Sequence, residues 1–485
     1  MIGLDAADID YIRENQRGLP HLRTVLTRGE LFHLSSDFEI FPGSVWPSFF
    51  TGKDTGEHGF YNIMAWDPAA MRLRRVTPNW LPLRPFWRDL SRQGLRVITL
   101  DVPMTYPPRE GSSIEITGWG THQTLSSCSI YPRSLAFEVS SRFGEDSLGS
   151  DVPLARDRQE RIRVRDRLIT SIVRKTRLAN WLMRTRDWDF FLLVFGEAHR
   201  GGHILWPSGE ELDPSWLLEV YRELDRTLGE LLSSGPLRYA TVMVFALHGM
   251  GPNYSQDHFT SLILKRLDGG PRIKEAPRSP SNLGNLLSMF RHNTHPRLRG
   301  VVSRYLPARV RDELVSRYYL RDYDRSMTQA LALKSDLNGY IRFNLAGRER
   351  AGVLAPEGQA LSGYVEYLRQ GFSSYVDEYG RQLVKKVVWT KDITSGARQA
   401  FLPDIVVQWE EEVKPARWIY SPIYGEITRK PDPWRVGHHR GRGFCAVLRP
   451  NSHCGTISSN GSELRVSDLS SMVLEEFGSS QESST

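Results

Sequence analysis

The chain is poor in cysteine, with only Cys128, Cys445 and Cys454 among its 485 residues. An odd count without the paired spacing of a metal knuckle argues against a disulfide framework and favours a reducing compartment. Long hydrophobic runs are also missing, because no segment approaches the ~18 apolar residues that a membrane-spanning helix requires. The first residues lack the charged and apolar stretches of a secretory signal. We therefore expect a cytoplasmic protein, unless the true start lies upstream of Met1.

Acidic residues are too few to balance the basic ones, which leaves a formal net charge of +7. The imbalance is concentrated in residues 265–325, where 14 lysines and arginines face six acidic residues. This stretch carries no recognisable nucleic-acid-binding motif, so no specific nucleic acid is expected. Three interpretations stay open: a solvated face, an amphipathic lid, or a surface that attracts a small anionic substrate.

Apolar strand candidates alternate with helical patterns along the chain, as in Leu95–Asp101 followed later by Trp216–Leu232. Such alternation predicts an α/β fold with a mostly parallel central sheet sandwiched by helices. The length exceeds the ~250 to 300 residues at which a single core usually stops growing. We therefore predict a catalytic core over residues 1–264 and 326–475, a basic insertion or lid over 265–325, and a flexible tail over 476–485.

The most informative segment is a run of apolar residues, Phe190–Phe195, that stops abruptly at Glu197, His199 and His203. The run predicts a strand covered on both faces, and ligands in open α/β sheets collect at the carboxyl ends of such strands. One helical turn would place both imidazoles on the same side. Two imidazoles and a carboxylate suit zinc or a similar divalent ion. A polar loop with incidental histidines is the alternative.

Other candidate ligands also follow predicted strands. His248 comes directly after the apolar run Thr241–Leu247, and His439 lies in the glycine-flanked segment Trp434–Gly443. Asp5 follows the few apolar residues at the amino terminus. A single histidine at a strand end is usually a packed residue, whereas several that converge on one edge favour a metal centre.

A hydroxyl follows the Pro-Gly turn at Pro42 and opens a short apolar helix candidate. This residue, Ser44, is either a helix cap or a nucleophile. Capping would be weaker than usual here, because Pro47 has no N–H group to donate.

The order of these motifs resembles the alkaline phosphatase superfamily, in its type I phosphodiesterase and nucleotide pyrophosphatase branch. The resemblance rests on Asp5, the segment Phe41–Gly52 with His58 after it, the pair His199 and His203, then His248 and His439. Three further segments are similar to those of bacterial members: Asp101–Pro108, Asn338–Glu349 and Leu402–Trp409.

The resemblance implies hydrolysis of phosphate mono- or diesters with one or two divalent metal ions, usually zinc, and a hydroxyl nucleophile. It implies that Asp5 and His248 bind the ion that activates the nucleophile, and that His203 and His439 bind the other. Arg440, beside His439, is the candidate for binding the substrate phosphate.

Three departures from the family pattern affect this assignment. Leu247 stands where the family usually has a metal carboxylate, and His199 replaces a second one. Glu197, Asp257 and His258 are the candidate substitutes. Counting in the family spacing leads to Pro42 as the nucleophile position, so Ser44, two residues later, is the expected nucleophile. The alternatives are a metal-bound water, or a catalytically silent member that binds a phosphorylated ligand or partner.

Overall fold

The fold is described from a computed structural model of the chain. It describes residues 1–106, 111–121, 125, 128–144, 155, 157–208, 212–268, 308–320, 323, 327–335, 337–432, 434–450 and 462–478. Most of the basic stretch 265–325 and most of the predicted tail 476–485 lie outside these ranges. Among the described helices, none is long and apolar enough to cross a membrane.

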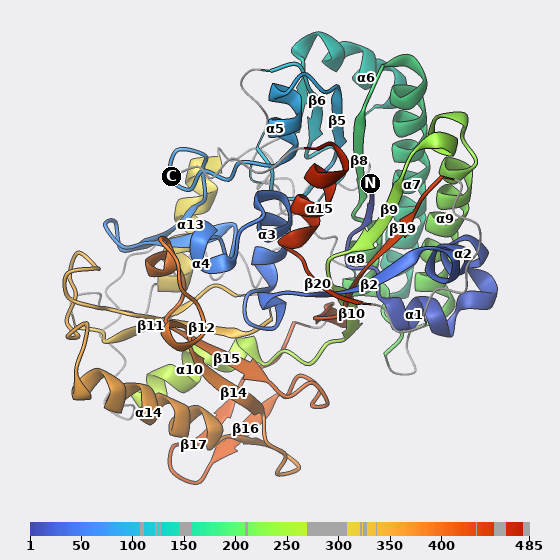
Figure 1. Cartoon of the computed structure of the whole chain (residues 1–485). Coiled ribbons are helices and arrows are strands. Elements are labelled where there is room, and N and C mark those ends of the chain that lie inside the picture. Colours follow the sequence, from blue (N-terminus) through green and yellow to red (C-terminus); the bar gives the residue numbers. More distant parts are fainter. Residues whose placement is uncertain are drawn as a thin grey trace. The chain divides into compact units, whose positions relative to one another are not determined.

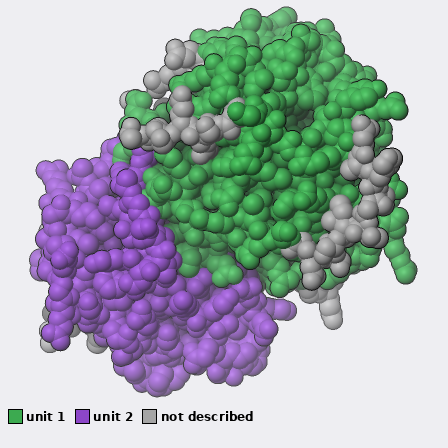
Figure 2. Space-filling view, in the orientation of Figure 1, with its two compact units in different colours: residues 1–58, 77–253, 433–485 green, residues 59–76, 254–432 purple. Residues whose placement is uncertain are grey.

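The chain divides into two compact units, coloured separately in Figure 2. Unit 1 comprises residues 1–58, 77–253 and 433–485, and unit 2 comprises residues 59–76 and 254–432. This division differs from the predicted scheme, in which residues 326–475 return to the core. The described strands between Ala330 and Thr428 belong to unit 2, where they pair with one another and not with the large sheet.

Unit 1 is built on one large sheet, which confirms the predicted α/β fold class (Figure 1). The described strands follow the order β20-β2-β19-β9-β1-β8-β5-β6-β7, and the central pairs from β9 to β6 are parallel. Their bounds are β1 Ile2–Leu4, β2 Glu30–Ser35, β5 Val97–Leu100, β6 Ile114–Thr117, β7 Ser129–Tyr131, β8 Phe190–Phe195, β9 Val242–Ala246, β19 Gly443–Leu448 and β20 Ser462–Arg465.

Helices cover both faces of this sheet, as the apolar run of β8 predicted. Every residue of β8 is buried. Phe191, Leu193 and Phe195 join the core cluster that also holds side chains of α7 Arg158–Thr185 and α9 Ser215–Leu232. On the strand-alternation rule Phe190 faces the other way, and its ring meets Phe86 and Phe477.

The remaining described helices of unit 1 are short. They are α1 Ile9–Glu14, α2 Pro20–Arg28, α3 Val45–Thr51, α4 Thr55–His58, α5 Trp87–Arg92, α6 Ala136–Phe143, α8 Glu197–Leu205 and α15 Asp468–Glu476. Asp8 caps α1 through a hydrogen bond that its carboxylate accepts from the Tyr11 N–H at 2.8 Å.

Unit 2 combines antiparallel sheets with three described helices, α10 Asp257–Leu267, α13 Ala308–Leu320 and α14 Gln359–Ser373. One sheet has the described order β11-β12-β15-β14, another β13-β16-β17, and a third pairs β3 with β4. The strand bounds are β3 Met64–Asp67, β4 Arg72–Arg75, β11 Ala330–Leu333, β12 Gly339–Phe343, β13 Val376–Asp377, β14 Val384–Trp389, β15 Ile405–Trp409, β16 Trp418–Ser421 and β17 Gly425–Thr428.

Candidate metal centre

Three parallel strands of unit 1 end at the same edge and deliver side chains to it. Asp5 follows β1, His199 and His203 lie on α8 directly after β8, and His248 follows β9. A two-stranded antiparallel ribbon, β10 Gly249–Pro252 and β18 Gly437–Arg440, completes the edge and pairs Met250 with His439. The topology therefore gathers residues from distant parts of the chain, as expected for the carboxyl edge of an α/β sheet.

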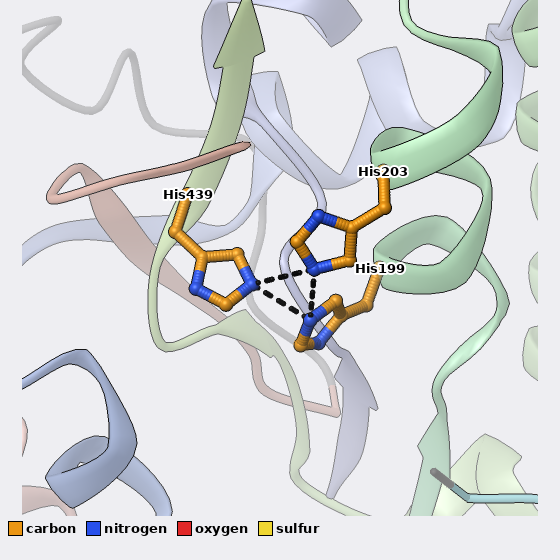
Figure 3. Close-up of side chains that lie close together, drawn as sticks. All are labelled: His199, His203 and His439. Carbon is orange, nitrogen blue, oxygen red and sulfur yellow. Dashed lines mark hydrogen bonds between the residues drawn. The ribbon is translucent and has the colours of Figure 1, made fainter. Parts of the chain in front are cut away.

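Three imidazoles point their Nε2 atoms at one another (Figure 3). The Nε2 of His199 lies 3.1 Å from that of His203, and the Nε2 of His439 lies 2.7 Å and 3.1 Å from these two atoms. All three residues are buried. Around a tetrahedral ion with Zn–N bonds of about 2.0 to 2.1 Å, ligand atoms stand roughly 3.3 Å apart. The two distances of 3.1 Å are therefore close to those between metal ligands, and the distance of 2.7 Å is about 0.6 Å shorter.

Hydrogen bonds at the other ring nitrogens fix the protonation of two of these imidazoles. His199 Nδ1 donates to the Asp5 carboxylate at 2.7 Å, and His203 Nδ1 donates to the Gly437 carbonyl at 3.0 Å. A neutral imidazole that donates from Nδ1 presents a lone pair at Nε2. The facing Nε2 atoms of His199 and His203 consequently cannot hydrogen-bond to each other, and a cation between them would remove the conflict.

Burial keeps two imidazoles of the cluster in the neutral, ligating form. Loss of hydration lowers the pKa of His203 and of His439 well below the usual range; Arg435 and nearby imidazoles lower that of His203 further, and nearby imidazoles lower that of His439. Burial also lowers the pKa of His248 to about 4. Only neutral imidazoles bind metal ions, so the site is prepared for a cation at neutral pH.

A second group of donors shares His199 with the first. Ligand atoms of Asp5, His199 and His248 lie within 4.8 Å of one another. The Asp5 carboxylate also accepts a hydrogen bond from the Trp46 indole at 2.9 Å. The His248 ring stacks on His439, with 4.8 Å between centroids and 21° between planes. Thus the structure brings together five of the residues predicted as ligands.

Glu197, a predicted substitute ligand, takes part in a buried ion-pair network instead. Its carboxylate accepts from the Ser171 hydroxyl at 2.8 Å and lies 3.2 Å from the Lys175 ammonium. The same ammonium lies 2.8 Å from the Asp101 carboxylate. Glu197 is therefore paired with Lys175, which it shares with Asp101. It belongs to neither donor group among the described residues.

The other two predicted substitutes are in unit 2. Asp257 and His258 open α10, and His258 Nε2 donates to the Ala416 carbonyl at 2.9 Å. Neither residue belongs to the donor groups found among the described residues. The missing carboxylates at positions 199 and 247 therefore find no replacement in these two side chains.

Ser44 ends the turn Pro42–Ser44 and precedes α3. Its hydroxyl is buried and donates to the Phe41 carbonyl at 2.7 Å, and no capping bond to α3 is found among the described residues.

Arg440, the predicted phosphate-binding residue, packs over Gly251, where an added Cβ would overlap the arginine side chain. Its charge also contributes to lowering the pKa of Asp8, although burial raises that pKa overall.

Sequence reasoning missed the groups that orient these ligands. The Trp46 indole and the Gly437 carbonyl hold Asp5 and His203 in place. Lys175 forms ion pairs with two buried carboxylates from the middle of a helix rich in basic residues. A tryptophan beside a Pro-Gly turn, or one lysine among many arginines, carries no local signal of such a role.

Comparison with known families agrees with the geometry. A family model described as type I phosphodiesterase / nucleotide pyrophosphatase matches residues 1–339. The chain belongs to this family. It is thereby a member of a family of hydrolases within the alkaline phosphatase superfamily, as the resemblance predicted. A comparison with the curated proteins finds no match.

Solved structures show the same fold at low sequence identity. Murine ectonucleotide pyrophosphatase/phosphodiesterase 5, solved as an inactive variant in complex with AMP, has a TM-score of 0.52 and 12% identity over 99% of this chain and 94% of that one. Phosphonoacetate hydrolase from Sinorhizobium meliloti 1021, in complex with phosphonoformate, has a TM-score of 0.51 and 14% identity over 97% of this chain and 93% of that one. At such identity the likeness shows the fold of this family member and no more.

Proposed function

We propose that this family member is a metal-dependent hydrolase of phosphate esters, with His199, His203 and His439 as metal ligands. One observation carries the proposal. Three buried Nε2 atoms lie 2.7 to 3.1 Å apart, and two of them present lone pairs to each other. Family membership supplies the reaction class.

The chemistry of the donor set favours a divalent ion such as zinc, since neutral imidazoles suit zinc better than magnesium or calcium. A bound divalent ion supplies Lewis acidity towards a phosphoryl oxygen. The chain's own contribution is to hold the imidazoles neutral, to orient two of them through Asp5 and Gly437, and to exclude water by burial. The expected substrates are small anionic phosphoesters, with Arg440 as the predicted phosphate-binding residue.

The test is metal content and turnover of purified protein. We expect bound zinc or a similar ion, turnover of p-nitrophenyl phosphate or bis-p-nitrophenyl phosphate, and loss of turnover after treatment with a chelator. His203→Ala should remove bound metal and activity together, because it takes away one of three ligands. His33→Ala is the matched control, since His33 lies on β2 outside both donor groups.

A metal-free wild-type protein that hydrolyses neither substrate would contradict the proposal. The alternative is then a silent member that binds a phosphorylated ligand. That alternative is favoured by Leu247, buried where the family usually has a carboxylate, and by the Ser44 hydroxyl already bonded to Phe41.

A further inference from the structure

We propose that the site holds one divalent ion on three imidazoles, and that Asp5 is a positioning residue acting through His199. The inference deepens the proposed function and rests on it, because it specifies how many ions the site binds and which residues bind them. It reassigns Asp5 and His248, which the family resemblance placed as ligands of a second ion.

The two carboxylate oxygens of Asp5 each accept a hydrogen bond from a buried ring. Oδ1 accepts from Trp46 Nε1 at 2.9 Å, and Oδ2 accepts from His199 Nδ1 at 2.7 Å. The backbone N–H of Asp5 donates to the Phe195 carbonyl at 2.9 Å, which ties the residue to β8. Asp5 is therefore held in the arrangement of a carboxylate that orients a ligating histidine and increases its basicity.

The histidine at position 199 makes this arrangement possible. An aspartate there would offer only acceptor oxygens, and Asp5 would then face another negative charge. An imidazole has one ring nitrogen for Asp5 and the other for the ion. A histidine in place of a carboxylate at position 199 therefore changes the role of Asp5. Asp5 no longer binds the ion, but hydrogen-bonds to the histidine that does.

A second ion on Asp5, His199 and His248 would compete with these bonds. If the Nε2 of His199 binds the first ion, only its Nδ1 is left, and that atom is 2.7 Å from the Asp5 carboxylate. Binding both ions through His199 would require removal of the Nδ1 proton, the one N–H proton of the neutral ring. Leu247 supplies no donor in place of the missing carboxylate, so the second group is also short of negative charge.

His248 then has a packing role beside the group formed by His199, His203 and His439. Its ring stacks on His439 and meets the edge of Phe38 at 4.9 Å. Its Nδ1 is buried and has no hydrogen-bond partner among the described residues. Because an unpaired buried nitrogen is the feature that would favour a second ion, replacing His248 tests that alternative directly.

The experiment measures the stoichiometry of Zn²⁺ on the full chain, reconstituted after chelation, by elemental analysis, and its affinity by competition with a chromophoric chelator. We expect one equivalent in the wild type. Asp5→Asn should keep one equivalent at saturation but bind it about 10- to 100-fold more weakly, the usual effect of losing a partner of a ligating histidine. His248→Phe, which keeps an aromatic ring against His439, should also keep one equivalent.

Two equivalents in the wild type, falling to one in Asp5→Asn and His248→Phe, would overturn the inference and leave the proposed function intact. No bound Zn²⁺ together with no turnover would overturn the proposed function itself. Circular dichroism of each variant checks folding, and the wild-type stoichiometry decides the question without any variant.

Discussion

At the residue scale, the presence of an imidazole in place of a carboxylate at position 199 accounts for much of the chemistry of the candidate site. Neutral imidazoles carry no charge, so burying three of them costs less than burying three carboxylates. Burial lowers the pKa values of His203 and His439, which keeps their lone pairs available at neutral pH. A cation bound by neutral ligands keeps its full charge and attracts an anionic substrate more strongly than one surrounded by carboxylates. On the proposed function, we therefore expect a histidine at position 199 to favour binding of phosphoesters even as it reduces the number of anionic ligands.

Neither the sequence nor the family spacing determines the role of Ser44, so an experiment must decide it. If its hydroxyl is the nucleophile, Ser44→Ala should abolish turnover of the chromogenic esters while leaving zinc content unchanged. The hydrogen bond to Phe41 would be lost as well, at about 0.5 to 1.5 kcal/mol of stability. Steady-state kinetics with thermal unfolding separates the two effects.

Ser48→Ala is the matched control for this variant, because Ser48 is buried on the adjacent helix and its hydroxyl pairs with His58 at 3.0 Å. It should retain turnover. Full activity in Ser44→Ala would exclude a serine nucleophile at this position and leave either a water-based reaction or none.

At the element scale, the ribbon β10–β18 determines whether the third imidazole reaches the other two. Its strands pair antiparallel from Gly249 with Arg440 to Pro252 with Gly437. The backbone N–H of Val436 donates to the His203 carbonyl at 2.9 Å, so the ribbon is fastened to α8 just before His439. A close approach of the two backbones is therefore part of the site.

Gly437 permits this approach, because an added Cβ would overlap the Gly202 carbonyl oxygen of α8. We expect Gly437→Ala to push β18 away from α8 and weaken zinc binding by about 10-fold or more, since small displacements of a ligand are costly. Gly441→Ala is the control, because its Cβ would meet only ordinary contacts at 3.4 Å. Equal zinc affinities in the two variants would show that the ribbon adjusts without affecting the ligands.

The sequence predicted the helices and strands better than the side-chain contacts between them. The apolar runs that became β8 and β9, and the helix that became α9, were recognisable because burial imposes a local pattern. His199, His203, His248 and His439 were predicted to converge because they lie at predicted strand-to-loop junctions and because the family resemblance implies a metal site there. Glu197 was proposed as a ligand on the same grounds, but its partner Lys175 comes from a helix distant in sequence. Side-chain pairing across elements depends on packing, which the local sequence does not encode.

At the scale of the whole molecule, the candidate metal centre belongs entirely to unit 1, although its ligands span residues 5 to 439. Residues 254–432, which come between His248 and His439 along the chain, form most of unit 2. Inserting a second unit between two strands of a sheet leaves the sheet intact when both ends of the insertion lie close together. The antiparallel pairing of β10 with β18 provides that condition, since the insertion leaves after one strand and returns before the other.

Buried imidazoles in both units predict how the stability of the ion-free protein depends on pH. Burial lowers the pKa of His248 and of His258 to about 4, below the value of about 6.5 expected in the unfolded chain. Between these values the unfolded chain binds protons that the folded protein does not, so stability falls as pH decreases from 6.5 towards 4. Above pH 6.5 these groups contribute no pH dependence.

We therefore expect the thermal unfolding midpoint, measured with a chelator present, to fall between about pH 7 and pH 5. His258→Gln should show a smaller decrease, because glutamine does not titrate and its amide can still donate to the Ala416 carbonyl. The buried carboxyls of Asp8, Asp225 and Asp268 have raised pKa values and act in the opposite direction. A midpoint that stays constant or rises towards pH 5 would mean that these acids, and not the imidazoles, control the acid response.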